Sequence, residues 1–203
     1  IEFTTTAAGD PVALKIGVPH DDLFTEMEAL RAFDARGAVR FLDADRDLAA
    51  ILMERISPGT MLWELDDDAQ QTRLAGKVMR ELPVSVPALH GMPRLADQVA
   101  KAFARNRTTP EFVELMPEEL MRCAEDLLRQ MLDDDPCEVM LHGDLHHENI
   151  LLDEHRGWLA IDPKGVIGPG PCQAARFLNN RIPDEATTDT RTSMMRARLD
   201  ILS

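Results

Sequence analysis

Apolar residues follow two different spacings along the chain, one typical of strands and one typical of helices. Near the beginning, short runs of β-forming residues predict two antiparallel strands, residues 2–6 and 11–16, joined by a glycine-containing turn. An apolar stretch at residues 48–53 predicts a further strand, which runs into a charged pair and a Pro-Gly turn. We therefore expect the first part of the chain to form a small antiparallel sheet.

Helical spacing of apolar side chains appears first at residues 22–36. The same spacing predicts amphipathic helices over residues 62–82 and 117–132, the second with a proline in its first turn. The apolar stripe of residues 117–132 is expected to be part of the core. Its members are Leu120, Ala124, Leu127, Leu128 and Met131.

A β-hairpin is predicted from the last residues of the run LHGDLHHENI, residues 141–150, onward. Residues 149–152 and 158–161 are short apolar runs on either side of a turn-like segment. Because a hairpin folds back on itself, it returns Asp162 to the neighbourhood of Asn149. Asp144 precedes Asn149 by five residues.

Asp144, Asn149 and Asp162 have the order and spacing of a phosphotransferase active site. In kinases an aspartate accepts the proton of the substrate hydroxyl, an asparagine five residues later holds magnesium, and an aspartate beyond a short hairpin holds magnesium across the ATP phosphates. Oxygen ligands suit Mg²⁺, which keeps several waters and shares its other positions with phosphate. We predict Asp144 as the catalytic base, and Asn149 and Asp162 as magnesium ligands. Glu148, next to Asn149, is expected to be either solvated or in contact with residues that surround the metal ligands, and not to be catalytic.

Two other interpretations of residues 141–150 stay open. They could form an ordinary turn in which Asp144 caps a helix, although that leaves Asp162 unexplained. His142, His146 and His147 could instead join this aspartate in the metal cluster of a hydrolase, because imidazole and carboxylate are good ligands for transition metals. Their spacing, however, differs from the common zinc-binding motifs.

The sequence HGDLHHENI at residues 142–150, followed by RGWLAIDPKG at residues 156–165, resembles the aminoglycoside phosphotransferase family. The resemblance is strongest to the branch that contains streptomycin 6-kinases and hydroxyurea-resistance kinases. Protein kinases usually carry arginine in place of Gly143 and Phe-Gly in place of Pro163-Lys164, so both differences favour a small-molecule kinase. The resemblance implies an α+β, protein-kinase-like fold with a small antiparallel-sheet lobe and a mainly helical lobe.

The resemblance also implies roles for residues of the nucleotide-binding lobe. Lys15, in the strand sequence VALKI, has the position of the lysine that neutralises phosphate oxygens of ATP. The next helix must then offer a carboxylate to Lys15. Glu26 and Glu28 lie about 200° apart around a helix of 3.6 residues per turn. Glu26 shares the face of Leu30 and Phe33, so we expect it to pair with Lys15, with Glu28 solvated.

By the same resemblance, residues 54–59 are the hinge between the lobes. Met53 would line the back of the adenine pocket. The carbonyl of Glu54 and the amide of Ile56 would form hydrogen bonds to the edge of the base. Since backbone groups make these bonds, the prediction depends on the register alone.

Compared with the family, the chain begins inside the second strand and stops about forty residues after Asp162. We expect residues 1–53 to form a nucleotide-binding lobe without its first strand and phosphate loop, and residues 60–203 to form a truncated catalytic lobe. Residues 169–173 also lack the acid expected in related kinases after the magnesium aspartate. The residue that braces the catalytic loop is therefore not identified.

Composition narrows the possible partners. With 22 basic and 36 acidic residues the net charge is 22 − 36 = −14, which disfavours nucleic acid and anionic membranes and suits a cationic small molecule. Three cysteines are too few for a disulfide framework. Neither a signal peptide nor an apolar run of membrane-spanning length is found, so a cytoplasmic protein is expected.

The expected activity is transfer of the γ-phosphoryl group of ATP, with Mg²⁺, to a hydroxyl of a small molecule, with an aminoglycoside such as streptomycin as the first candidate. A kinase of another small metabolite, such as a sugar, a choline-like alcohol or a ketoamine, is the alternative enzyme. A nucleotide-binding pseudokinase is the alternative from another class. The intact residues Asp144, Asn149 and Asp162 argue against a pseudokinase, whereas the missing phosphate loop argues for one.

Overall fold

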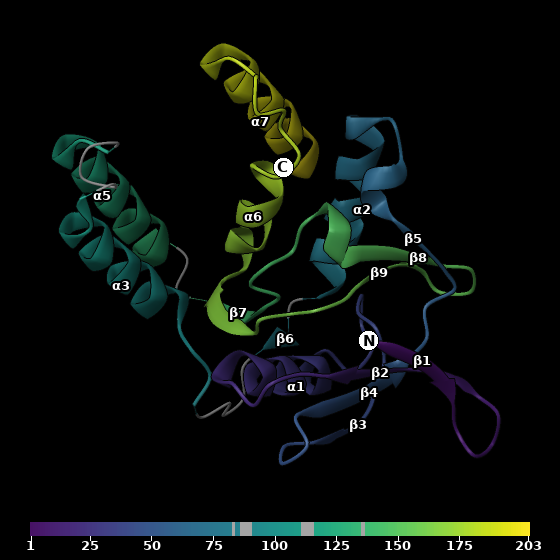
Figure 1. Ribbon diagram of the computed structural model, residues 1–203. Coiled ribbons are helices and arrows are strands. Elements are labelled where there is room, and N and C mark those ends of the chain that lie inside the picture. The colour runs from purple at the N-terminus through teal and green to yellow at the C-terminus, as the bar shows by residue number, and fades with distance from the viewer. Residues whose placement is uncertain (83, 86–90, 111–115, 135–136) are drawn as a thin grey trace.

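The first part of the chain forms a four-stranded antiparallel sheet packed against one helix (Figure 1). The computed structural model describes residues 1–82, 84–85, 91–110, 116–134 and 137–203. The strand order is β1-β2-β4-β3, with β1 (Glu2–Thr5), β2 (Pro11–Ile16), β3 (Phe41–Asp45) and β4 (Ala50–Glu54). The small antiparallel sheet expected from the sequence is confirmed.

Helix α1 (Asp21–Phe33) covers this sheet. It begins where the His20 side chain accepts a hydrogen bond from the Asp22 amide, and it ends at Asp34, whose backbone is left-handed with φ 49°. The helix predicted at residues 22–36 therefore ends earlier than expected. Its buried face packs Met27 and Leu30 against the β4 side chains Ile51 and Met53.

The second part contains two three-stranded sheets. One has the order β5-β8-β9, with β5 (Pro58–Met61), β8 (Ile150–Asp153) and β9 (Gly157–Ala160). Antiparallel pairing of Ile150 with Ala160 and of Asp153 with Gly157 confirms the predicted hairpin. The other sheet has the order β10-β7-β6, with β6 (Val84–Ser85), β7 (Glu138–Leu141) and β10 (Val166–Pro169).

Helices make up most of the remaining described chain (Figure 1). They are the 3₁₀ turns η1 (Leu62–Glu64), η2 (His147–Asn149) and η3 (Gly170–Ala174), and α2 (Asp68–Glu81), α3 (Leu95–Thr108), α5 (Glu118–Asp134), α6 (Ala175–Leu178) and α7 (Thr188–Leu202). The single helix predicted over residues 62–82 is wrong at its start. The Asp67 side chain accepts hydrogen bonds from the Ala69 and Gln70 amides and so caps α2 six residues later.

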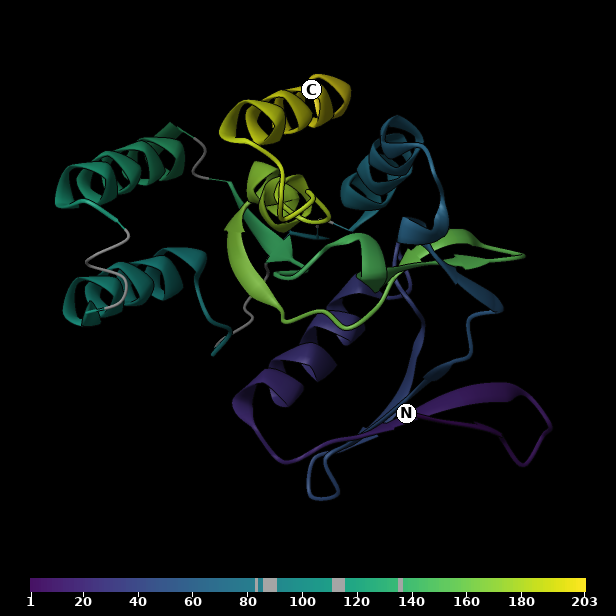
Figure 2. The ribbon, with the colours of Figure 1, turned by 45° about the horizontal axis from the view of Figure 1, so that its top comes forward.

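The apolar stripe predicted for the core on residues 117–132 is also placed differently. The helix itself is confirmed as α5, but Leu120, Leu127 and Met131 are exposed. Figures 1 and 2 show the reason: α5 packs beside α3, and this pair stands away from α2, α6 and α7. Amphipathic spacing predicts a helix and an apolar face, but it does not say what covers that face.

The main core joins the two parts of the chain. It contains Phe33 of α1 together with buried side chains from α2 and its C-cap, from the hairpin and from α6; Val78, Leu82, Ile150 and Phe177 are among them. Backbone bonds reinforce this packing, because the Val39 amide donates to the Ala160 carbonyl at 2.9 Å. Helix α1 is thus fixed to the hairpin that ends beside Asp162. Among the described residues, no helix has the length and apolar character to span a bilayer.

Candidate active site

The predicted catalytic base, the predicted magnesium ligands and the predicted Lys15–Glu26 pair come from separate elements and line one cavity of about 430 Å³. Lys15 lies on β2 and Glu26 on α1. Asp144 and Asn149 lie in the connection between β7 and β8, with Asn149 at the end of η2, and Asp162 follows β9. The fold thus brings together all five residues, which the sequence separates by up to 147 positions.

Lys15 is held by two carboxylates. Its Nζ atom donates to both carboxylate oxygens of Glu26 at 2.8 Å and to Oδ1 of Asp162 at 3.2 Å. Burial alone would lower the pKa of Lys15, but the bonds and charges of Glu26 and Asp162 outweigh it and raise that pKa. Glu28 instead pairs with Arg31 at 2.7 Å on the outer face of α1. The expected contact is therefore made by Glu26.

Asp162 has a left-handed backbone, with φ 55°, which is unusual for a residue other than glycine and costs of the order of 1–3 kcal/mol. The residues around it hold this conformation. The Ile161 amide donates to the Asn149 carbonyl at 3.0 Å. Gly165 lies so close to α1 that an added Cβ would be 2.8 Å from the Thr25 carbonyl oxygen. The segment around Asp162 is thereby held between the hairpin and α1.

A buried histidine orders the loop that carries Asp144. His142 Nε2 lies 2.8 Å from the Ile161 carbonyl oxygen, and its Nδ1 accepts from the Asp144 amide at 3.3 Å. Because a carbonyl can only accept and an amide can only donate, the ring is neutral with its proton on Nε2. Burial, opposed by the bond to Ile161, lowers the pKa of His142 to about 4.

Gln173 braces the loop that carries Asp144. The sequence has no acidic residue at positions 169–173 that could do so. The Gln173 side-chain oxygen accepts from the His142 amide at 3.0 Å, and the residue is buried on η3. The sequence analysis missed this role because it searched for a carboxylate. Any buried side-chain acceptor can satisfy an amide, so a glutamine at the same place suffices.

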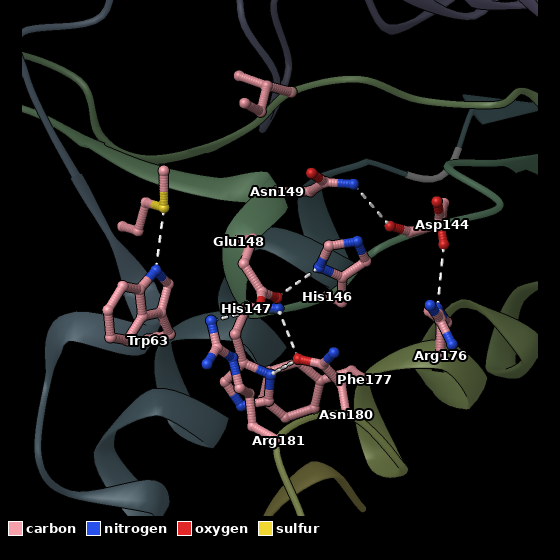
Figure 3. A network of polar contacts seen from close by, with 12 residues as sticks. Trp63, Asp144, His146, His147, Glu148, Asn149, Arg176, Phe177, Asn180 and Arg181 are labelled. Carbon is pink, nitrogen blue, oxygen red and sulfur yellow. Dashed lines mark hydrogen bonds and ion pairs between the residues drawn. The ribbon is translucent and has the colours of Figure 1, made fainter.

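Asp144 is paired with two cations on the open side of the cavity. Its Oδ2 lies 3.1 Å from Lys164 Nζ, and its Oδ1 accepts from Arg176 Nε at 3.1 Å (Figure 3). The Asn149 amide nitrogen donates to the Asp144 carbonyl oxygen at 3.0 Å. Although burial would raise the pKa of the Asp144 carboxyl, Lys164 in particular holds it below its usual value. Sequence reasoning assigned no role to Lys164 or Arg176.

The predicted hinge residues line a second cavity of about 340 Å³, which Asp162 also lines. Met53, Glu54 and Ile56 form part of its wall. The Glu54 side chain is fixed from outside this wall, because it accepts hydrogen bonds from the Arg40 amide at 2.7 Å and from the Arg156 guanidinium. Arg156 belongs to the β8–β9 turn and also donates to the Ala38 carbonyl at 3.2 Å.

The three histidines near Asp144 do not form a metal cluster. The ring of His142 is engaged with backbone groups, whereas His146 Nδ1 lies 2.7 Å from Glu148 Oε2. His147 stacks on Phe177 with a centroid distance of 4.1 Å, and its Nδ1 lies 2.7 Å from Asn180 Oδ1. Within the described part of the chain, no three histidine, cysteine or carboxylate side chains come together as a metal-binding group.

The sequence profile of the aminoglycoside/hydroxyurea antibiotic resistance kinases matches residues 3–203. The chain belongs to this family. A streptomycin 6-kinase of Streptomyces glaucescens is 31% identical over 96% of this chain and 63% of its own length. A hydroxyurea phosphotransferase of Kitasatospora aureofaciens is 35% identical over 81% of this chain and 49% of its own length. The chain thus spans about half to two thirds of these two relatives.

Solved structures confirm the kinase-like α+β fold of this family member. An ethanolamine kinase of Plasmodium vivax superposes with a TM-score of 0.64 at 12% identity, covering 99% of this chain and 67% of that one. An aminoglycoside phosphotransferase of Streptomyces rimosus, whose structure holds ADP and streptomycin, gives a TM-score of 0.52 at 18% identity, covering 98% and 88%.

The donor atoms at the site fit a magnesium ion. The bond from its nitrogen to Asp144 orients the Asn149 amide and leaves the oxygen Oδ1 to face a cation (Figure 3). Asp162 adds a carboxylate on the same cavity. Magnesium takes a few protein oxygens and completes its shell with waters and phosphate oxygens. A site with two oxygen-bearing side chains and open space therefore suits it better than it suits a transition metal.

Proposed function

We propose that this protein transfers the γ-phosphoryl group of ATP to a hydroxyl of a small, cationic molecule, with streptomycin as the first candidate. One observation carries the proposal: Lys15, Glu26, Asp144, Asn149 and Asp162 line a single cavity. Phosphoryl transfer demands mainly positioning and charge neutralisation, and these side chains supply both. We also propose that residues 54–59 join a nucleotide-binding lobe, residues 1–53, to a catalytic lobe, residues 60–203.

On the nucleotide side, the apolar cavity beside Met53 would receive the adenine, and backbone groups of Glu54 and Ile56 would bond its edge. The nearby ammonium of Lys15 would contact phosphate oxygens. Glu26 keeps that ammonium charged and fixed, so its position is set before the nucleotide arrives. This arrangement reduces the reorganisation needed when a polyanion binds.

Asn149 and Asp162 would hold magnesium, which neutralises charge on the phosphates when it is bound. The left-handed backbone of Asp162 directs its carboxylate into the cavity shared with Lys15. Asn149 is oriented by its bond to the same loop that carries Asp144. The ligand residues and the proposed base are therefore positioned by one hydrogen-bonded unit.

Asp144 would orient the acceptor hydroxyl and take its proton as the bond to the γ-phosphorus forms and the bond from that phosphorus to the bridging oxygen breaks, which releases ADP. The lowered pKa of the Asp144 carboxyl keeps it ionised and makes it a weak base, so its main contribution is to orient the hydroxyl. That suits a loose transition state, in which the nucleophile needs little activation. The acceptor hydroxyl would replace Lys164 or Arg176 as a partner of Asp144.

The relatives support an aminoglycoside as the acceptor. Streptomycin 6-kinases of two Streptomyces species are 31% identical to this chain, and the net charge of −14 suits a polycation. The hydroxyurea phosphotransferase, at 35% identity, supports hydroxyurea as a second candidate, with its N-hydroxy group as the acceptor. The same catalytic residues would serve either molecule.

Mass spectrometry of candidate acceptors tests the proposal. Full-length protein, ATP and magnesium would be incubated with streptomycin, other aminoglycosides, hydroxyurea, sugars and amino alcohols. We expect one added phosphate on streptomycin, absent with Asp144→Asn and retained with the control Asp126→Asn, an exposed aspartate on α5. ATP binding without phosphate on any acceptor would establish a pseudokinase instead.

A further inference from the structure

An arginine of the chain lies in a small cation-binding arrangement beside the proposed active site (Figure 3). Its guanidinium carbon, Cζ of Arg181, lies 4.5 Å from the centroid of the Trp63 ring. Its Nη2 lies 2.5 Å from Oε1 of Glu148. A planar guanidinium that stacks on an indole and pairs with a carboxylate uses the two interactions that such a cation makes best.

Both receiving side chains are held in place without Arg181. The indole Nε1 of Trp63 donates to Sδ of Met61 at 3.0 Å, so the ring is oriented and its face is left for stacking. The second carboxylate oxygen of Glu148 lies 2.7 Å from His146 Nδ1. The sequence left two environments open for Glu148, solvent or contact with residues around the site, and its contact with His146 agrees with the second.

The backbone of Arg181 is left-handed, with φ 59°, an uncommon conformation for arginine. Its neighbours impose it. On one side, the Asn180 side chain contacts the His147 ring, and the Asn180 carbonyl oxygen accepts from the Arg198 guanidinium at 2.7 Å. On the other side, Ile182 is buried. The backbone is thus fixed on both sides, whereas the Arg181 side chain is 43% exposed to solvent.

The arrangement is linked to the catalytic loop by one side chain. His146 lines the cavity that contains Asp144 and Asn149, and its ring contacts Glu148. On its other side Glu148 lines a separate cavity of about 500 Å³ together with Arg181, Ile182, Pro183 and Asp184. A molecule that presents a hydroxyl to Asp144 and extends past His146 would reach Glu148.

We propose that Trp63 and Glu148 form a subsite for a guanidinium group of the acceptor, and that Arg181 occupies this subsite until the acceptor displaces it. This inference rests on the proposed function, because it concerns the acceptor of the same reaction. Streptomycin carries guanidino groups on its aminocyclitol ring, so it has the required chemistry. A simple ammonium would bind less well, because it is more strongly hydrated and lacks a planar face.

A binding experiment without ATP tests the subsite independently of turnover. The chain has two tryptophans, so Trp158→Phe leaves Trp63 as its sole tryptophan fluorophore. In this background, the chain of 203 residues would be titrated with methylguanidinium at constant ionic strength. The key variant is Arg181→Asn, because asparagine tolerates a left-handed backbone and lacks the cation.

We expect a saturable change of Trp63 fluorescence in Arg181→Asn, and about tenfold weaker binding when Arg181 is present to compete. Methylammonium should give no saturable change, and Glu148→Gln added to Arg181→Asn should abolish the response to methylguanidinium. The exposed arginine variant Arg196→Ala serves as the control and should behave as its parent. Thermal unfolding of each variant shows whether it is folded.

Two results would overturn the subsite. One is a folded Arg181→Asn variant that does not bind methylguanidinium, which would make Arg181 a permanent brace. The other is equal binding of methylammonium, which would make Glu148 a non-selective anion. If turnover is found, Arg181→Asn should lower KM for a guanidino acceptor several-fold and leave KM for an acceptor without guanidino groups unchanged. Binding without any turnover would refute the proposed function and leave the subsite standing.

Discussion

The two sides of the proposed catalytic cavity hold their charges in different ways. On the nucleotide side, Glu26 and Lys15 are largely enclosed, with side-chain exposures of 7% and 23%. On the acceptor side, Asp144 pairs with Lys164 and Arg176, whose side chains are 58% and 60% exposed. Ion pairs in both places have similar lengths, between 2.8 and 3.2 Å.

The difference lies in what each pair must do. A buried carboxylate that loses its partner is left uncompensated, so the Lys15–Glu26 pair stays closed and fixes the lysine. Exposed pairs contribute little to stability and exchange readily with solvent or ligand. The proposed nucleotide side is therefore fixed before any ligand binds, whereas on the proposed acceptor side Asp144 could exchange its cations for an acceptor hydroxyl.

The largest expected effect is that of removing the charge of Asp144. Asp144→Asn keeps the shape of the side chain but removes its charge and the group proposed to take the acceptor proton. We expect kcat to fall by about 10³-fold, within the range for loss of a general base. Because the enclosed nucleotide side is untouched, the affinity for ATP should stay within about twofold. Steady-state kinetics and nucleotide titration would measure both.

Equal loss of turnover and of ATP binding in Asp144→Asn would contradict the separation of the two sides. It would show instead that Asp144 supports the fold of the whole cavity. The unfolding midpoint of the variant distinguishes that outcome from a local effect.

The pH dependence of stability tests the role of buried His142, which orders the loop that carries Asp144. Burial lowers the pKa of His142 to about 4, below its usual value of 6.5, so the unfolded chain binds a proton more readily than the folded one. The stabilisation is complete above pH 6.5 and is lost as the pH falls through 6.5 toward 4. We expect the contribution of His142 to the free energy of unfolding to fall by about 2 kcal/mol between pH 7 and pH 5.

Urea unfolding of the wild type and of His142→Gln at pH 7 and pH 5 would measure this contribution. The variant should be less stable at pH 7, and its stability should fall by about 2 kcal/mol less on acidification. His147, whose pKa burial also lowers to about 4, remains in both proteins and cancels in the comparison. Identical slopes would show that the His142 ring is accessible to protons in the folded state.

A smaller effect is expected from Glu26→Gln on the enclosed side. Glutamine fills the same space but withdraws the charge that holds Lys15, and Asp162 remains as its partner. Charge-assisted hydrogen bonds are worth about 1.5–3 kcal/mol, so we expect about a tenfold loss of kcat/KM for ATP. Glu28→Gln, two positions along the same helix and paired with Arg31, is the matched control. A similar loss in both variants would contradict the assignment of Glu26.

The sequence predicted those parts of the site that depend on local spacing. Asp144, Asn149 and Asp162 lie on one short loop and one hairpin, so their separation along the chain largely determines their separation in space. Glu26 was separated from Glu28 by the same kind of argument, because a helix has a fixed period. The kinase-like fold followed from the resemblance that these motifs carry.

The partners from distant elements could not be predicted in this way. Gln173, Arg176 and Arg181 reach the catalytic loop across 31 to 33 residues, and no periodic pattern marks them. The exposed face of α5 shows the same limit, because what a helix packs against depends on elements far along the chain. The start of α2 was misplaced for a local reason: Asp67 caps the helix, so the preceding apolar residues are left to a 3₁₀ turn.

The smallest predicted effect bears most directly on the difference between the two sides. A double-mutant cycle on unfolding free energy, with Asp144→Asn and Lys164→Met, should give a coupling energy below about 1 kcal/mol that decreases as salt is raised from 0.1 to 1 M. The corresponding cycle with Glu26→Gln and Lys15→Met should give a larger, salt-insensitive coupling, because that pair is enclosed. A strong, salt-resistant coupling at Asp144 would mean that Lys164 locks the base in place. The acceptor hydroxyl could then reach Asp144 only after a costly rearrangement, and the open side would be as fixed as the nucleotide side.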